Sequence, residues 1–410
     1  MHDLMNNKNN SDNYISTLIN NTWNQTPLRR NFEDRLLELG ISFNQAEENL
    51  EIGYRTINGI LDGTLERIDF LSLLKIGQFL DISYNQITDL YVNAIATKHK
   101  EDLDKSHRRT FILNNFDLPV LKNIGVIDSI RDFEYIERQL NDVLGLNSIT
   151  EYNLDDIEVA YSSGTITPKN LNSRKYFIKK ARAIFKAINN DNSYQKEALI
   201  EYFPKIKRQC IDVENGLLNV IKSLYNLGVT VIFQPRTPSI QLRGATFAVN
   251  NKPCIVLTDY KGYYPTLWFA LIHEIFHVIF DWEEILKKAY HLSDESDDIL
   301  IVKQKEDEAN EFARDFMFPR AKLENIKDQI SNRLDVREMA MNNNVHPSFI
   351  YANYAYEMSS EQKNLWQNFN KLKLFPPFNN LIKKLTNGLG HTSKAFEYAG
   401  YYKLNIFNKP

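Results

Sequence analysis

The sequence predicts a mainly α-helical protein with one small antiparallel β-sheet, an α+β class. Apolar residues recur at helical spacing along most of the chain, and only three short runs are rich in β-branched residues, at 229–233, 244–247 and 254–257. The 410 residues exceed what one core usually supports, so two or three domains are expected. A hydrophobic fraction of 43% with 25% charged residues is typical of a globular chain.

The net charge, the cysteine content and the lengths of the apolar runs argue against several classes of protein. The formal net charge is −3, so nucleic-acid affinity requires a local basic patch. Cys210 and Cys254 lie far apart and outside any CxxC spacing, which argues against a disulfide framework or a cysteine zinc site. No apolar run reaches the roughly 18 to 20 residues of a membrane span, and the first residues lack the pattern of a secretory signal. We therefore expect a cytoplasmic protein with no membrane partner.

The N-terminal part of the chain predicts a small helical domain. Residues 1–24 are polar and rich in Asn, which indicates a flexible N-terminus. A domain at 25–95 follows, in which the first helix begins near Leu28 and ends at Gly40. Further helices are expected at 43–50, 54–61, 68–80 and 84–92. The two that join at 51–53 have the layout of a helix-turn-helix.

The second of these two helices holds the candidate DNA contacts. Tyr54, Arg55 and Asn58 lie where a recognition helix would meet base edges. Negative charge crowds the same region, at Glu47, Glu48, Glu51 and Asp62. These carboxylates oppose phosphate binding, so two interpretations stay open: a domain that binds double-stranded DNA, or a helical module that binds protein or simply packs.

The remaining elements follow in order along the chain. The stretch KHKEDLDKSH at 98–107 predicts a linker or an exposed helix, with a domain boundary near residue 105. A helical middle region is expected over 105–200, and the three β-branched runs come after it. Pro265 then opens a strongly apolar helix expected to run to about Ala289. The next helix is expected from Lys303 to Phe318, followed by further helices and a tail of unassigned role.

His273, Glu274 and His277 form an HExxH sequence inside the apolar helix. Residues at i and i+4 lie about one turn apart on the same face, so both imidazoles can bind one cation. Glu274 lies beside the first histidine, where its carboxylate can take a proton from the attacking water. Neutral imidazoles at a tetrahedral site favour zinc. A core helix without metal is the alternative, but burying two histidines and a glutamate together is costly.

A catalytic zinc site needs a third protein ligand. The helix that contains EDEANEFARDFMFP supplies Glu306 as the first choice, because it begins a face that continues at i+4 and i+7. Glu308 lies on a different face, and Asp307 is the third candidate. His291 could instead complete a three-histidine site, although an acidic loop at 293–298 adjoins it. Oxyanion-donor candidates, by proximity in sequence only, are Tyr260, Tyr263 and Tyr264. The favoured interpretation is that these three residues are ordinary loop aromatics.

Several motifs together resemble a known peptidase family. The runs RGATF, PCIVL and TLWFALIHEIFHVIF, followed by EDEANEFARDFMFP and VHPSFI, look like those of the ImmA/IrrE-type (M78-like) zinc metallopeptidases. The resemblance implies a zincin-like peptidase domain at 201–360, with zinc held by His273, His277 and Glu306. It also implies that Glu274 acts as the general base.

The resemblance has departures and limits. Phe276 stands where a glycine is common in that family, and Asp281 stands where many members have a further histidine. The helices at 25–95 resemble a Xre-type helix-turn-helix domain. Residues 361–410 remain a C-terminal extension of unknown role.

The predicted function is a zinc-dependent endopeptidase that cleaves a specific protein partner. The resemblance implies that this partner is a Xre-like repressor or an antitoxin-like regulator, cut in stress response or mobile-element control. The alternative is a DNA-binding transcription regulator or toxin–antitoxin component whose peptidase-like domain senses a ligand without cleavage. Whether the chain forms a homodimer stays open.

Overall fold

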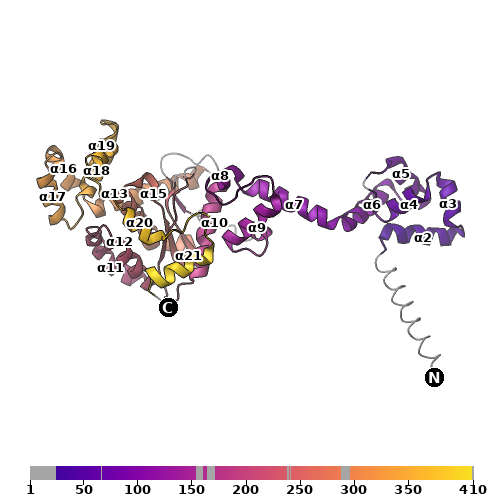
Figure 1. Cartoon of the computed structure of the whole chain (residues 1–410), viewed down its shortest axis with the longest axis horizontal. Coiled ribbons are helices and arrows are strands. Elements are labelled where there is room, and N and C mark those ends of the chain that lie inside the picture. Colours follow the sequence, from indigo (N-terminus) through magenta and orange to yellow (C-terminus); the bar gives the residue numbers. More distant parts are fainter. Residues whose placement is uncertain are drawn as a thin grey trace, which may run out of the picture. The chain divides into compact units, whose positions relative to one another are not determined.

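The computed structural model divides into two compact units, one up to Thr110 and one from Phe111 onward (Figure 1). It describes residues 25–65, 67–153, 160–163, 171–237, 240, 242–287 and 296–408. The expected flexible terminus at 1–24 and the candidate ligand His291 lie outside these residues. Within them, no helix has the length and apolar character needed to cross a bilayer.

The N-terminal unit is a bundle of short helices with its own core. Its helices are α2 (Pro27–Leu39), α3 (Phe43–Leu50), α4 (Tyr54–Leu61), α5 (Phe70–Phe79) and α6 (Tyr84–Lys98). Gly40 ends α2 in the left-handed conformation with φ 64°, as its position predicts. Ser42 and Ser83 open α3 and α6 with capping boxes, which fix where these helices begin. The charge-rich stretch after α6 belongs to the helix α7 (Lys100–Asn115) and is exposed.

The larger unit combines many helices with one sheet. The helices that precede the last three strands of the sheet are α8 (Leu118–Asn123), α9 (Phe133–Leu144), α10 (Leu171–Ile188), α11 (Lys196–Gln209) and α12 (Gly216–Asn226). Those after it are α13 (Tyr264–Phe280), α14 (Trp282–Leu286), α15 (Ser296–Met317), α16 (Arg320–Ile326), α17 (Arg333–Asn342), α18 (Ser348–Glu357), α19 (Leu365–Lys371), α20 (Asn379–Thr386) and α21 (Ala395–Tyr401). The chain is therefore mainly helical with a small sheet, as its composition and periodicity predict.

The sheet differs from the predicted antiparallel arrangement of three strands. In the described residues it has four strands, β1 (Ala160–Ser163), β2 (Thr230–Phe233), β3 (Leu242–Val249) and β4 (Lys252–Leu257), in the order β1-β3-β4-β2. A two-residue turn with positive φ at Asn250 and Asn251 makes β3 and β4 an antiparallel hairpin. The other edge of β4 pairs with β2, and because the hairpin has reversed the chain, this pairing is parallel. The sheet is thus mixed.

Both faces of β3 are covered by helices. Thr246 points to α13, where its hydroxyl meets Glu274, whereas the Phe247 ring packs against Phe185 of α10 at 5.3 Å on the opposite face. This explains why nearly all residues of β3 and β4 are buried and why neither strand alternates polar and apolar residues. The helix α13 therefore packs directly on one face of the sheet.

The C-terminal residues complete the core of this unit. Helices α10 and α21 lie side by side (Figure 1). The Tyr402 hydroxyl accepts a hydrogen bond from the Phe233 backbone N–H at 2.9 Å, and the Phe407 ring stacks on Tyr225 at 3.9 Å. The tail that had no assigned role in the sequence therefore belongs to the same hydrophobic core as the sheet.

Acid is expected to destabilise this unit through His346, which precedes α18. Its Nδ1 accepts a hydrogen bond from the Ser348 N–H, and burial lowers its pKa from 6.5 to about 4. Between these pH values the unfolded chain therefore binds a proton that the folded chain does not. The contribution of neutral His346 to the free energy of unfolding is fully present above pH 6.5 and is lost as pH falls through 4. It amounts to about 3 kcal/mol.

The measurement is urea unfolding near pH 7 and near pH 4 for the unmodified protein and for His346→Asn. Asn cannot take up the proton but can still accept the hydrogen bond. The unmodified protein should lose more stability on acidification than the variant does. Equal losses in the two proteins would contradict the role of His346.

Candidate metal centre

The helix α13 carries the HExxH residues through the middle of the larger unit. Pro265 lies in its first turn, where a missing N–H costs nothing. Apolar side chains surround the helix on nearly every side, and His273, Glu274 and His277 are buried among them with at most 2% of their surface exposed. The helix ends at Phe280, and Asp281, with φ −110°, separates it from the helix α14, so the expected continuation to about Ala289 is wrong.

Three ligand atoms converge beside α13. The Nε2 atoms of His273 and His277 are 3.2 Å apart, as expected for side chains one turn apart. The Glu306 carboxylate spans the two rings, with Oε2 at 3.2 Å from His273 Nε2 and Oε1 at 3.4 Å from His277 Nε2. The structure therefore brings all three predicted ligands together within 4.8 Å.

The helix α15 selects Glu306 among the candidates that the sequence left open. Ala309 and Ala313 are fully buried, which places one face of α15 against α13 and directs Glu306 to the histidines. Asp307 and Glu308 are exposed, and Glu308 accepts a hydrogen bond from Gln304 at 2.9 Å. Among the candidates that the structure describes, only Glu306 reaches the histidines.

The charges of this cluster favour a bound cation. Burial alone would raise the pKa of Glu306, but hydrogen bonds and the charges of the two histidines lower it to about 2. Burial alone would lower the pKa of His277, yet its contacts with Asp281 and Glu306 raise it to about 10. Without a metal, a proton therefore supplies positive charge between these groups. A divalent cation offers the same charge balance through the same nitrogen and oxygen atoms.

Asp281 holds the second imidazole in place, a role that we did not predict. Its Oδ2 accepts a hydrogen bond from His277 Nδ1 at 2.8 Å, which leaves Nε2 free to act as a ligand. Its Oδ1 lies 3.2 Å from the ammonium of Lys305, the neighbour of Glu306 in α15. This chain of contacts ties α13 to α15. The i+4 spacing from His277 was the available signal, but a single acidic residue at a helix end is common.

The Glu274 carboxylate lies against β3, which sequence reasoning also missed. The Thr246 hydroxyl donates a hydrogen bond to Oε2 at 2.7 Å, whereas Oε1 has no hydrogen-bond partner among the described residues. Burial raises the pKa of this carboxyl above its ordinary value. A Cβ atom at Gly244 would lie 2.8 Å from Oε1, so a larger residue here would displace the carboxylate from its position. The RGATF run thus shapes the site from the strand side.

Asp281→Ala is expected to weaken metal binding at this cluster about 10- to 100-fold, which is typical when a ligating histidine loses its orienting carboxylate. Asp281→Asn should weaken it less, because an amide oxygen can still accept from Nδ1. Competition titration with a chromophoric zinc chelator measures the affinity, and Glu283→Ala on the neighbouring exposed position is the matched control. An affinity unchanged in Asp281→Ala would contradict the orienting role.

The oxyanion candidates are not brought together. The Tyr264 hydroxyl is buried and donates to the Cys210 carbonyl at 2.8 Å, so it is not free for a ligand. Tyr263 stacks on Trp366 at 5.5 Å. Tyr260 lines an apolar pocket beside α13.

The three candidate DNA contacts lie on or near the surface of α4. Tyr54 is 56% exposed, and its N–H donates to the Glu47 carboxylate at 2.8 Å. The amide of Asn58 is already bonded, to the Tyr54 carbonyl at 2.9 Å and to Arg29 at 2.7 Å. Arg55 is exposed and makes no ion pair with the residues that the structure describes. Of the three, Arg55 has the side chain most free to reach a ligand.

Comparisons with models of protein families, with curated proteins and with solved structures find no match to this chain.

Proposed function

We propose that the chain is a zinc-dependent endopeptidase. The observation that carries the proposal is the convergence of His273, His277 and Glu306 within 4.8 Å, with the Glu274 carboxylate on the same helix. Two imidazoles and one carboxylate are the protein ligands of many catalytic zinc sites, which leave a fourth position open for the reaction. A structural zinc site would normally use four protein ligands, and the described residues supply three.

The donor set fits zinc. Both histidines present Nε2 to the same point, and the low pKa of Glu306 keeps its carboxylate charged at neutral pH. A zinc ion held there supplies Lewis acidity, which polarises a peptide carbonyl and makes water acidic enough to attack near pH 7.

The residues of the chain then perform the proton transfers. Glu274 accepts a proton from the attacking water through Oε1, the oxygen that has no partner among the described residues. The water oxygen bonds to the carbonyl carbon, the C–N bond breaks, and the same carboxyl delivers the proton to the leaving amine. Thr246 holds the other oxygen, and Gly244 provides the space that the carboxylate needs.

The resemblance to ImmA/IrrE-type peptidases supports a narrow protein substrate, such as a Xre-like repressor or an antitoxin-like regulator. The test is to incubate the zinc-loaded protein with candidate regulators encoded beside its own gene and to identify new peptide termini by mass spectrometry. Cleavage that a zinc chelator stops and added zinc restores supports the proposal. Binding of a regulator that stays intact under all conditions favours the sensor alternative.

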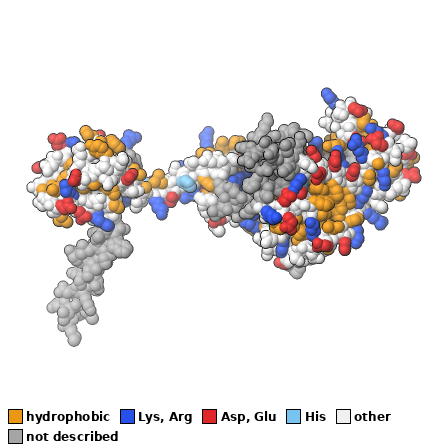
Figure 2. Space-filling view, turned by 180° about the vertical axis from the view of Figure 1, so that it is seen from behind, with side chains coloured by type: hydrophobic (Ala, Val, Ile, Leu, Met, Phe, Trp, Pro, Cys, Tyr) orange, Lys and Arg blue, Asp and Glu red, His pale blue; other side chains and the backbone are white. Residues whose placement is uncertain are grey.

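The N-terminal unit is proposed to recognise a partner, with double-stranded DNA as one candidate. Helices α3 and α4 join through three residues, Glu51 to Gly53, as a helix-turn-helix requires. Charged side chains of both signs and apolar side chains mix on the surface of this unit (Figure 2), and Leu37 and Leu71 are 80% and 60% exposed. This surface resembles a protein-binding face more than a basic DNA-binding stripe.

If the unit binds DNA, Arg55→Ala is expected to weaken binding about 5- to 100-fold, because Arg55 is the candidate contact with a free guanidinium. A mobility-shift assay at about 150 mM salt with DNA from the region upstream of the gene measures the loss. Arg67→Ala, an exposed arginine outside α4, is the control. No shift with the unmodified protein would favour a protein ligand instead.

A further inference from the structure

An apolar pocket of about 90 Å³ lies beside the metal-ligand cluster. Three of its walls come from elements that also carry site residues. Arg243 precedes Gly244 on β3, the Phe269 ring lies one turn before His273 on α13 with ring centroids 6.1 Å apart, and Ala313 lies two turns after Glu306 on α15. The pocket and the ligand cluster are therefore built by the same rigid elements.

Most of the lining of the pocket is apolar. Its apolar residues include Phe269, Met317, Phe349, Ala352 and Trp366. An engineered apolar cavity of about 150 Å³ holds a benzene molecule, so the smaller volume here suits a side chain of about Leu or Met size. Such a side chain would gain most of its hydrophobic transfer energy on entering.

The charged residues that line the pocket are all cations, called its cationic rim below. They are Arg243, Lys261 and Arg314, no Asp or Glu lines it, and none of the three makes an ion pair with the described residues. The Arg243 guanidinium lies over the Phe269 ring at 5.7 Å, and Arg314 lies over Tyr356 at 4.2 Å. Burial and the nearby charge of Arg243 lower the pKa of Lys261. A carboxylate arriving at this rim would relieve that repulsion.

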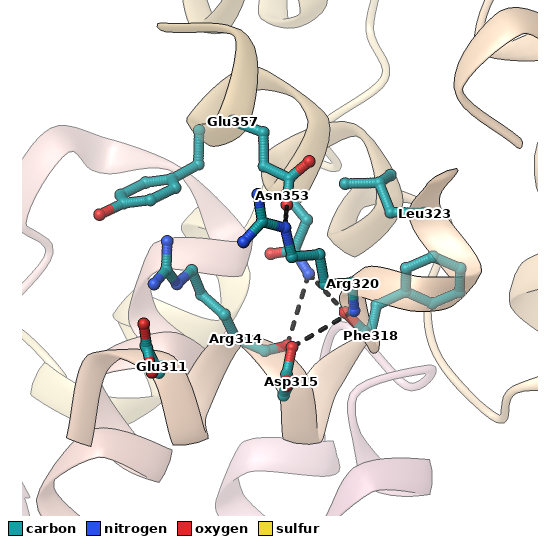
Figure 3. A pocket seen from close by; sticks show the side chains of 9 residues that line it. Glu311, Arg314, Asp315, Phe318, Arg320, Leu323, Asn353 and Glu357 are labelled. Carbon is teal, nitrogen blue, oxygen red and sulfur yellow. Dashed lines mark hydrogen bonds and ion pairs between the residues drawn. The ribbon is translucent and has the colours of Figure 1, made fainter. Parts of the chain in front are cut away.

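A neighbouring polar pocket of about 330 Å³ shares Arg314, Asn353 and Tyr356 but has a different character (Figure 3). Its lining includes acidic residues, and Arg320 is already paired, since its Nε lies 3.0 Å from Glu357 Oε1. The Asn353 amide donates to the Phe318 carbonyl at 2.8 Å, which joins α18 to the end of α15. This pocket therefore offers no unpaired cation other than Arg314. Arg314 and Tyr356, which are in contact with each other, line both pockets.

We propose that the apolar pocket is the specificity pocket of the site, and that it binds a Leu-sized side chain whose neighbouring group is a carboxylate. This proposal rests on the proposed peptidase function. The carboxylate has two chemical sources, an acidic residue next to the apolar one or the free C-terminus of a chain that ends in the apolar residue. The substrate class is thus a polypeptide with an apolar residue beside a negative charge.

The experiment measures equilibrium binding by fluorescence anisotropy, using zinc-loaded Glu274→Gln so that peptides stay intact. The probes are short labelled peptides with amidated C-termini that contain Leu-Glu, Leu-Gln or Ala-Glu, and a pair that ends in Leu with a free or an amidated terminus. Leu-Glu should bind about tenfold tighter than Leu-Gln and than Ala-Glu. If instead the free terminus gives the tighter binding, the carboxylate is that of the chain end.

Pocket variants locate the preference. Arg243→Gln and Arg314→Gln should each reduce the preference for the carboxylate, and Ala352→Leu should weaken binding of Leu by filling the pocket. Arg208→Gln, an exposed arginine on α11 outside both pockets, is the matched control. Equal or absent binding of all peptides overturns the proposal, and so does a preference that survives both arginine variants.

Cleavage by the unmodified protein separates this proposal from the function on which it rests. Cleavage of peptides without regard to Leu or to the carboxylate would support the peptidase proposal and contradict the specificity-pocket proposal. The predicted binding preference, without cleavage of either the peptides or the candidate regulators, would support the pocket and contradict the peptidase.

Discussion

His273→Ala is expected to abolish stoichiometric zinc binding. The unmodified protein, saturated with zinc and then dialysed, should retain one equivalent per chain by elemental analysis. The variant loses one of three ligands at a site that is almost fully buried, and the remaining His277 and Glu306 cannot enclose the ion. Because even the loss of an orienting neighbour costs about 10- to 100-fold in affinity, the loss of a ligand should cost more than about a hundredfold.

The histidine replaced in the control should be one that lies away from the site. His107→Ala changes an exposed histidine in α7 and should bind zinc as the unmodified protein does. Because a metal that binds the folded chain and not the unfolded one stabilises the fold, we expect zinc to raise the melting temperature of the unmodified protein and of His107→Ala only. Full zinc binding by His273→Ala, or none by the unmodified protein, would refute the site.

The ligands could be predicted from sequence because their arrangement is local. The HExxH spacing sets His273 and His277 one turn apart in any helix, and that distance does not depend on the rest of the fold. Glu306 required a second helix to dock on the first. The buried alanines Ala309 and Ala313 leave room for that close approach, yet the sequence could only rank Glu306 above Glu308 and Asp307.

The parts that could not be predicted depend on contacts between distant segments. The parallel pairing of β2 with β4 follows from which edge of the hairpin is free, and no local pattern encodes that choice. The roles of Gly244 and Thr246 appear only when β3 lies against α13. The early end of the apolar helix at Asp281 was hidden because the contact of Asp281 with Lys305 comes from a different helix, α15.

Glu274→Gln is expected to reduce cleavage about 10²- to 10⁴-fold while zinc binding is retained. The amide keeps the size of the side chain and can still accept the Thr246 hydrogen bond, but it cannot take a proton from water. Initial rates on a regulator that the unmodified protein cuts, together with the zinc content of each preparation, give the two readouts. Glu308→Gln, an exposed glutamate on α15, should keep its full rate.

Thr246→Val tests how much of the rate depends on holding the Glu274 carboxylate in position, as distinct from its ability to accept a proton. Valine removes the hydroxyl that holds Glu274 Oε2 at 2.7 Å and leaves the carboxyl in place, so its effect should be smaller than that of Glu274→Gln. Glu274→Gln removes the only carboxylate that α13 carries between the two histidines. A Glu274→Gln protein that binds zinc and cuts at the unmodified rate would therefore exclude Glu274 as the base and require a different route for the proton.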